Sequence, residues 1–329
     1  QTIIDKASIT LAKHKFVYLA MEVRTGKTLT SLGIANKLKC KEVLFLTKKK
    51  AITSISKDYD MLCPNSFSLF IINYESIHKI PNVKWDMIIV DEAHSLGAFP
   101  KPNKRAKQVR DIIKVNRCLV CLMSGTPTPE SYSQMYHQVF GIPTNPFKEH
   151  KTFYKFANQY VDKRQKKINS MYINDYTRGY ETIIEKMNPY TYRFSQSDAG
   201  FKVDTKEHIL NVEMNEVTYS LCRKLKRNRV IEGDEEVILA DTPVKLMMKL
   251  HQLYSGTIKF ESGKGMVIDT SKAQFIYKKF ATKKIAIFYK FKQELKAIKE
   301  VFGDDICTEL SLFKETNKSI ALQIVSGRE

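Results

Sequence analysis

One stretch decides the fold of this chain: Trp85-Asp86-Met87-Ile88-Ile89-Val90-Asp91-Glu92-Ala93-His94. Residues 87–90 are all bulky and apolar, which is typical of a strand buried on both faces of a parallel sheet. Asp91 and Glu92 follow at its carboxyl end, where open α/β sheets bind their ligands. Two adjacent carboxylates are costly there unless they meet a cation or take part in chemistry. The alternative is a strand that ends in a plain acidic turn.

A second stretch, near the amino end, predicts a phosphate-binding loop. A strand at residues 15–20 leads through Met21-Glu22-Val23-Arg24-Thr25-Gly26-Lys27-Thr28 into a helix that continues through residue 35. A strand, a tight turn and a helix carrying Gly-Lys-Thr are the layout of such a loop. Backbone N–H groups near Gly26 would face phosphates, Lys27 would neutralise the β and γ oxygens, and the Thr28 hydroxyl would bind Mg²⁺. The pattern prefers glycine at its first position, where this chain has Met21.

Strands and helices alternate through the first 140 residues. Further strands are expected at 42–47, 67–72, 87–90 and 119–123, and each is followed by a polar cluster: Lys48-Lys49-Lys50, Asn73-Tyr74-Glu75, Asp91-Glu92 and Ser124-Gly125-Thr126-Pro127. This pattern predicts a doubly wound parallel sheet. In a protein with a phosphate-binding loop, Asp91 would help to hold Mg²⁺, and Glu92 would position a water for attack on the γ-phosphate of ATP.

Composition points to a large basic protein with a polyanionic partner. The 329 residues predict about two domains of roughly 150 residues each. The 54 Lys and Arg residues exceed the 35 Asp and Glu residues, and the net charge of +19 makes nucleic acid the first candidate partner. A generally solvated basic surface is the alternative. No apolar run is long enough to cross a bilayer, so we expect no membrane partner beyond a surface contact. Six scattered cysteines fit a reducing, intracellular compartment.

The later part of the chain is less regular. Residues 147–192 are rich in Tyr, Lys and Asn and predict mainly helix or loop, with basic runs at 163–167 and 223–229 that are either solvated faces or nucleic-acid contacts. A second α/β region begins near residue 270, with strands expected at 285–289 and 319–325 and a helix at 291–302. Cys118 and Cys121 lie in an expected strand, so core packing is favoured over a metal site.

Several of these stretches resemble the motifs of superfamily 2 helicases, in their order along the chain. Motif I is represented by residues 20–28, motif II by Asp91-Glu92-Ala93-His94 and motif III by Ser124-Gly125-Thr126-Pro127. Thr47-Lys48-Lys49, Asn73-Tyr74-Glu75, residues 286–291 and residues 323–329 resemble motifs Ia, Ib, IV and the start of V. Residues 246–256 resemble the helix before the second motor domain of Swi2/Snf2-type translocases, including phage-type ones.

The resemblance implies two RecA-like lobes that close on ATP and Mg²⁺, with nucleic acid bound across both. Glu92 would be the general base, acting with Asp91 and Lys27, and Thr28 and Asp91 would bind Mg²⁺. The implied nucleotide contacts are Gln1, Arg24, Thr25, Gly26, Lys27 and Thr28. The implied nucleic-acid contacts are Lys48, Lys49, Asn73 and Tyr74. His94, Ser124 and Thr126 would couple the nucleotide state to lobe closure.

The expected organisation is a first RecA-like lobe at 1–146, a helical and basic insertion at 147–200, and a second lobe at 201–329 that stops before the arginine-bearing motif VI. Arg24 stands where Swi2/Snf2-type proteins have glycine. Because an arginine of the kind that motif VI carries contributes about 10³–10⁵ in rate in related enzymes, we expect the chain as given to bind ATP and to hydrolyse it slowly.

The function expected is an ATP-dependent DNA translocase or helicase, with DNA-stimulated ATPase activity, in the cytoplasm of a bacterial or phage-infected cell. Duplex or branched DNA is the expected partner, with RNA as the alternative, and the oligomeric state stays open. A nucleic-acid-binding module, or a motor subunit of a larger complex with little ATP turnover of its own, is the alternative function. DNA-stimulated ATP turnover separates the two.

Overall fold

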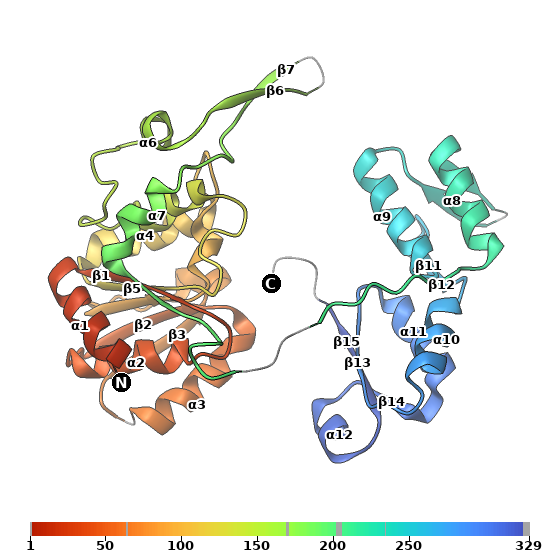
Figure 1. The fold of residues 1–329 in the computed structure, drawn as a ribbon, viewed down its shortest axis with the longest axis horizontal. Helices are drawn as coiled ribbons and strands as arrows, with labels where there is room; N and C mark the ends of the chain where they lie inside the picture. Colours follow the sequence, from red (N-terminus) through yellow and green to blue (C-terminus); the bar gives the residue numbers. More distant parts are fainter. Residues whose placement is uncertain (1, 64, 169–170, 202–205, 234, 325–329) are drawn as a thin grey trace. The chain divides into compact units, whose positions relative to one another are not determined.

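The computed structural model describes residues 2–63, 65–168, 171–201, 206–233 and 235–324 (Figure 1). The chain divides into two compact units, Gln1–Asp204 and Thr205–Glu329. The predicted boundaries at residues 146 and 200 stay predictions.

Unit 1 is built on a six-stranded parallel sheet with the order β3-β2-β4-β5-β1-β8. The strands are β1 (Phe16–Met21), β2 (Glu42–Thr47), β3 (Ser68–Asn73), β4 (Met87–Val90), β5 (Leu119–Met123) and β8 (Thr191–Phe194). The predicted parallel α/β fold is therefore confirmed, and the sheet is consistent with a RecA-like lobe. Because β5 lies between β4 and β1, the segments that follow these three strands emerge at one edge of the sheet.

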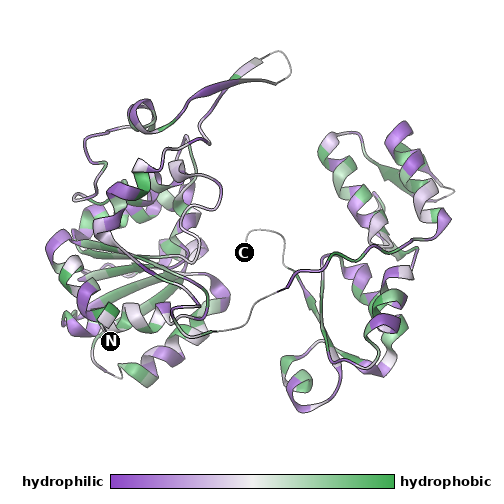
Figure 2. Cartoon of the chain, viewed as in Figure 1, coloured by the Kyte–Doolittle hydropathy of each residue, from purple (hydrophilic) through white to green (hydrophobic). Residues whose placement is uncertain are grey.

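Alternate residues of each central strand pack into two hydrophobic clusters, one on each face. In β1, Phe16 and Tyr18 join the cluster that contains residues of α4, α5, α6 and α7, whereas Val17 and Leu19 join the cluster that contains residues of α1, α2 and α3. In Figure 2 the central strands are coloured as hydrophobic, and the helices around them carry both hydrophobic and hydrophilic residues. The helices are α1 (Thr2–His14), α2 (Lys27–Lys37), α3 (Ile52–Leu62), α4 (Lys104–Asn116), α5 (Met135–Val139), α6 (Phe153–Tyr160) and α7 (Thr182–Met187).

Cys118 and Cys121 pack against different clusters. Cys121 is buried in the cluster that contains α1, α2 and α3, whereas Cys118 is partly buried against the cluster that contains α4 to α7. The two thiols thus lie on opposite faces of the sheet, Cys121 within β5 and Cys118 immediately before it.

Three strands lie in a region for which the sequence predicts mainly helix or loop. β6 (Arg164–Ile168) and β7 (Met171–Asp175) form an antiparallel hairpin, and β8 pairs in parallel with β1. These strands are polar or only partly buried, so they lack the continuous apolar run that identifies the central strands. β8 is a four-residue edge strand whose position depends on its pairing with β1.

Unit 2 contains a three-stranded parallel sheet of order β13-β15-β14, which is part of the predicted second lobe. Its strands are β13 (Ala286–Tyr289), β14 (Ile306–Cys307) and β15 (Ser319–Gln323), with helices α10 (Ser271–Phe280), α11 (Lys292–Phe302) and α12 (Leu310–Glu315). A separate cluster joins α8 (Glu216–Asn228) and α9 (Pro243–Tyr254) to the hairpins β9 (Val230–Glu232)–β10 (Val237–Leu239) and β11 (Thr257–Lys259)–β12 (Gly265–Val267). Most of the predicted motif V, residues 325–329, lies outside the described residues.

No helix within the described residues has both the length and the apolar character needed to cross a membrane.

Candidate active site

The candidate site lies where β1, β5 and β4 end side by side. The loop after β1 reaches α2 through Gly26, whose φ of 84° and ψ of 27° are left-handed. Arg24 also has a positive φ, 66°, so this arginine occupies a conformation that favours glycine. No side chain caps the start of α2 at Gly26, which leaves its first backbone N–H groups for an anion, as in phosphate-binding loops.

Lys27 lies within electrostatic reach of all three chain segments at this edge. Its Nζ donates to the backbone oxygens of Met21 at 2.9 Å and Glu22 at 3.0 Å. A Cβ atom added to Gly125, after β5, would lie 3.7 Å from the same Nζ. Desolvation lowers the pKa of Lys27, and the nearby carboxylates of Glu92 and Asp91 oppose that shift. The lysine is thus positioned between the loop and the acidic turn.

Asp91 is held in a defined orientation at the end of β4. One carboxylate oxygen accepts a hydrogen bond from the Thr47 hydroxyl at 2.8 Å, and the other accepts from the Glu92 backbone N–H at 3.0 Å. Burial raises the pKa of Asp91, and the bond from Thr47 lowers it. Thr47 itself is fully buried at the end of β2. A desolvated carboxylate of this kind favours a neighbouring cation.

Glu92 and His94 form a polar pair immediately after Asp91. Glu92 has a left-handed backbone, with φ 51° and ψ 46°, and one carboxylate oxygen lies 3.2 Å from His94 Nδ1. The hydrogen bond from His94 lowers the pKa of Glu92 most, and Lys48 and Lys27 lower it further. Glu92 is therefore ionised at neutral pH and able to accept a proton.

His94 also connects the acidic turn to the segment after β5. Its Nδ1 lies 2.9 Å from the Ser124 hydroxyl, which in turn accepts a hydrogen bond from the Thr126 backbone N–H at 3.1 Å. Ser124 is fully buried. The three residues for which a coupling role is expected are thus hydrogen-bonded to one another, and the Nδ1 atom that faces Ser124 is the one that lies 3.2 Å from the Glu92 carboxylate.

The four predicted nucleic-acid contacts have different surroundings. Lys49 is exposed, and Lys48 and Asn73 are half-buried. Tyr74 is buried, and its hydroxyl donates to the backbone oxygen of Asp91. The Arg105 guanidinium lies over the Tyr74 ring at 5.1 Å. The Tyr74 side chain therefore supports the acidic turn in this structure, and its contact with nucleic acid stays a prediction.

Residues at the end of β8 and after it form hydrogen bonds to the loop that follows β1. The sequence did not predict these contacts. The Gln196 backbone N–H donates to a Glu22 carboxylate oxygen at 2.7 Å, and its side-chain amide donates to the Val23 backbone oxygen at 3.0 Å. The Glu22 N–H donates to the Phe194 oxygen at 2.9 Å. Residues 174 apart in the chain meet here, and no local pattern identifies such a contact.

Of the remaining predicted ligands, Thr25 lies in the loop, Thr28 lies at the start of α2, and Gln1 lies outside the described residues. The Thr25 hydroxyl donates to the Glu22 backbone oxygen at 2.7 Å, and Thr28 is half-buried in the first turn of α2. Gln1, expected to contact the nucleotide, lies outside the described residues. Hydroxyl and carboxylate oxygens from Thr28 and Asp91 fit Mg²⁺, a cation that completes its coordination with water and substrate phosphate oxygens.

Comparison with known proteins identifies one family. The family model described as "SNF2-related domain" matches residues 35–256, about two thirds of the chain. The match includes the acidic turn after β4 and the Ser-Gly-Thr-Pro segment after β5, and it starts after the loop at Gly26. A search of curated proteins found no match.

Proposed function

The chain belongs to the SNF2-related family of helicase-like ATPases and translocases, and we propose that it hydrolyses ATP and uses the energy to move along or remodel DNA. Members of this family generally use ATP with Mg²⁺ and act on nucleic acids. The observation that carries the proposal is the position of Lys27, Asp91 and Glu92 at one edge of the sheet, where the two carboxylates act on the lysine electrostatically.

Each residue of the edge has a role in the proposal. The backbone N–H groups after Gly26 and the Lys27 ammonium bind the phosphates of ATP. Thr28 and Asp91 hold Mg²⁺, whose charge lowers the cost of the negative charge that develops on the phosphates. The ionised Glu92 accepts the proton of the attacking water. The His94–Ser124–Thr126 chain transmits the state of that carboxylate to the segment after β5.

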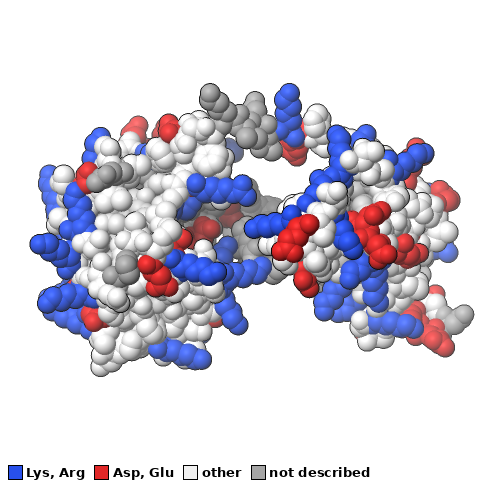
Figure 3. Space-filling model, turned by 90° about the horizontal axis from the view of Figure 1, so that it is seen from below, with Lys and Arg blue, Asp and Glu red and all other residues white. Residues whose placement is uncertain are grey.

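DNA is the proposed partner, with Lys48, Lys49 and Asn73 as contacts to its phosphates. The net charge of +19 supports a polyanionic partner, and Figure 3 shows lysine and arginine side chains over the visible face of each unit. Phosphate contacts give affinity without sequence preference, which suits a protein that must move along its substrate.

The test is ATP turnover by the full chain with no nucleic acid, duplex DNA, forked DNA or RNA. We expect either DNA form to raise turnover above the rate without nucleic acid. The rate of the Glu92→Gln variant serves as the background rate. Turnover that stays at that background with every nucleic acid, while DNA still binds, would contradict the proposal and favour the alternative of a nucleic-acid-binding module.

A further inference from the structure

The β6–β7 hairpin projects from unit 1 and has no partner strand beyond itself in the described structure (Figure 1). None of the described residues of either strand belongs to a hydrophobic cluster of unit 1. A two-stranded hairpin without such packing is only marginally stable in water. Packing in the core therefore does not account for the presence of the hairpin, and its exposed side chains are considered as a binding surface.

The region around the hairpin combines positive charge with exposed aromatic rings. Residues 151–180 contain seven lysines and arginines, two aspartates and five of the 16 tyrosines of the chain. Three of the tyrosines expose much of their surface: Tyr154 (48%), Tyr172 (67%) and Tyr180 (48%). Basic groups that track a backbone, together with rings on which bases stack, are typical of proteins that bind single-stranded nucleic acids.

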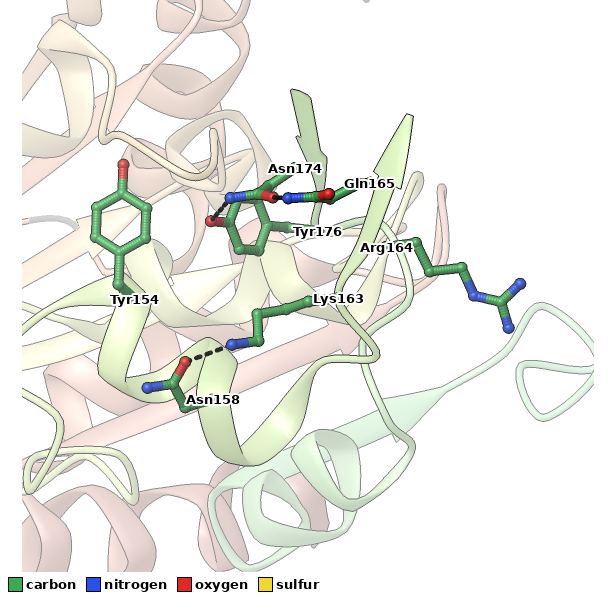
Figure 4. Close-up of a pocket in the computed structure, with 7 residues that line it drawn as sticks. All are labelled: Tyr154, Asn158, Lys163, Arg164, Gln165, Asn174 and Tyr176. Atoms are coloured by element: carbon green, nitrogen blue, oxygen red, sulfur yellow. Dashed lines mark hydrogen bonds between the residues drawn. The ribbon is translucent and has the colours of Figure 1, made fainter. Parts of the chain in front are cut away.

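A polar pocket of about 250 Å³ lies at the base of the hairpin (Figure 4), lined by Tyr154, Asn158, Lys163, Arg164, Gln165, Asn174 and Tyr176. Lys163 Nζ donates to Asn158 at 2.7 Å, and Asn174 donates to the Tyr176 hydroxyl at 3.3 Å. Tyr176 is 8% exposed, and its ring packs edge-on against Phe153 at 5.4 Å. Phe153 and Tyr176 belong to the same hydrophobic cluster of unit 1, so the pocket wall is packed against the core of the unit.

The charges at the pocket are only partly balanced within the chain. Asp162 lies 3.0 Å from the Arg164 guanidinium and 3.8 Å from that of Arg178, and Asp175 lies opposite Arg164 in the hairpin ladder, so two acids stand against three cations, Lys163 included. The adjacent Lys163 bonds to a neutral amide. A net positive charge remains at the base of the hairpin, next to the Tyr154 ring.

We propose that this hairpin surface, defined by Tyr154, Lys163, Arg164, Tyr172 and Arg178, binds an unpaired DNA strand. The cations contact its phosphates, and the tyrosine rings stack on its bases. In a duplex the faces of the bases are covered by their neighbours, so rings at the surface of the protein have bases to stack on only where the strands are separated. This inference rests on the proposed function, because the unpaired strand is taken to be part of a forked or otherwise unwound DNA substrate.

The aromatic part is tested by fluorescence anisotropy of the full chain, without nucleotide, on a labelled single strand, a fork and a blunt duplex. Tyr154→Leu/Tyr172→Leu removes both rings, and Tyr154→Phe/Tyr172→Phe keeps them as the matched control. We expect the Leu pair to bind the single strand and the fork at least about tenfold more weakly, since one stacked base commonly contributes that much. The Phe pair should stay within about twofold of the parent, and the Leu pair should bind the blunt duplex as the parent does.

The charged part is tested through the salt dependence of single-strand binding. Losing two phosphate contacts in Lys163→Gln/Arg164→Gln should reduce the slope of log K against log salt by about 1.4. The matched control is Lys107→Gln/Lys114→Gln, which removes two exposed charges from α4 and should leave the slope nearly unchanged.

Two results would overturn the inference: single-strand binding by the Leu pair equal to that of the parent, or equal slopes for the two charge variants. The same measurement on a labelled RNA of the same sequence tests the assignment to DNA, which is overturned if the Leu pair weakens the RNA complex more than the DNA complex. Failure of the proposed function is distinguishable, because the ATP turnover of the parent protein tests that function and these binding measurements contain no nucleotide.

Discussion

His94 lowers the pKa of Glu92 more than any other neighbour does. The hydrogen bond from His94 Nδ1, at 3.2 Å, is the largest cause that lowers the pKa of Glu92. A lowered pKa stabilises the folded chain at a pH above the pKa of the unfolded state, and this contribution disappears as the pH falls through the folded pKa. The same shift keeps the proposed base ionised in mildly acidic solution.

His94→Ala should therefore move the acidic limb of the pH profile of ATP turnover to higher pH. Without the histidine, the pKa of Glu92 rises toward its usual value, so protonation inactivates the base earlier on acidification. The measurement is kcat/KM against pH for the variant and the parent. His78→Ala, a change at an exposed histidine, is the control. An unshifted acidic limb in His94→Ala would count against Glu92 as the titrating base.

Glu92→Gln and Lys27→Ala should separate chemistry from binding. The amide introduced by Glu92→Gln cannot accept the proton of the water, so turnover should fall by about 10²–10⁴ while ATP binding is kept. Lys27→Ala removes the ammonium near the phosphates and should weaken ATP binding itself. Single-turnover rates and titration with a fluorescent ATP analogue measure the two quantities, and Glu149→Gln at an exposed site is the control. Near-normal turnover in Glu92→Gln would show the assignment of the base to be wrong.

At the scale of elements, the start of α4 is tied to the acidic turn by one side chain. Asn103 Oδ1 accepts a hydrogen bond from the Ala106 backbone N–H at 2.8 Å, and its Nδ2 donates to the Ser95 backbone oxygen at 2.7 Å. The first bond caps the helix, and the second connects the helix to η3 (Ala93–Leu96), which follows Glu92 directly.

Asn103→Ala should lower the free energy of unfolding by about 1–2 kcal/mol, because it removes both the cap and the tether. Asn103→Asp keeps the acceptor for the cap and loses only the donor, so it should cost less. Urea denaturation of the parent and the two variants measures the difference. Equal midpoints for all three proteins would mean that the cap contributes nothing to the stability of the fold.

At the scale of the whole molecule, the two units have separate cores of different size. The buried clusters of unit 1 cover both faces of a six-stranded sheet, whereas the described part of unit 2 has two small clusters around a three-stranded sheet and two hairpins. Less buried apolar surface gives less stabilisation. Unit 2 should therefore unfold first, and nucleotide bound at the loop after β1 should stabilise only unit 1.

Differential scanning calorimetry of the full chain should show two transitions. ADP with Mg²⁺ at about 100 times its dissociation constant adds about 2.7 kcal/mol to the state that binds it. For a unit of about 200 residues this corresponds to an increase of roughly 5–10 °C in the upper midpoint. The lower midpoint should not move, and Lys27→Ala should show a smaller shift under the same conditions. A nucleotide-dependent shift confined to the lower transition would contradict the location of the site in unit 1.

Local sequence was sufficient to predict the four inner strands of the main sheet, β2, β4, β5 and β1, because strands buried on both faces are continuous apolar runs. It also predicted the edge strand β3, which carries a similar apolar run. It was also sufficient to bring the acidic turn and the loop at Lys27 to one edge, since the carboxyl ends of parallel strands share an edge. The short polar strands of the hairpin and β8 were not predicted. Their position follows from pairing with a partner strand, and no run of apolar residues marks them.

The contacts that tune the candidate site depend on residues far apart in the chain. Thr47 and Asp91 are separated by 44 residues, and Gln196 and Glu22 by 174. Tyr74 lies in a segment that resembles a nucleic-acid-binding motif. In the structure its side chain is buried, and its hydroxyl donates to the backbone oxygen of Asp91. A sequence pattern reports the type and spacing of side chains along one element. Which donor reaches which carboxylate is set by how the elements pack, and so by burial and hydrogen bonding across the sheet.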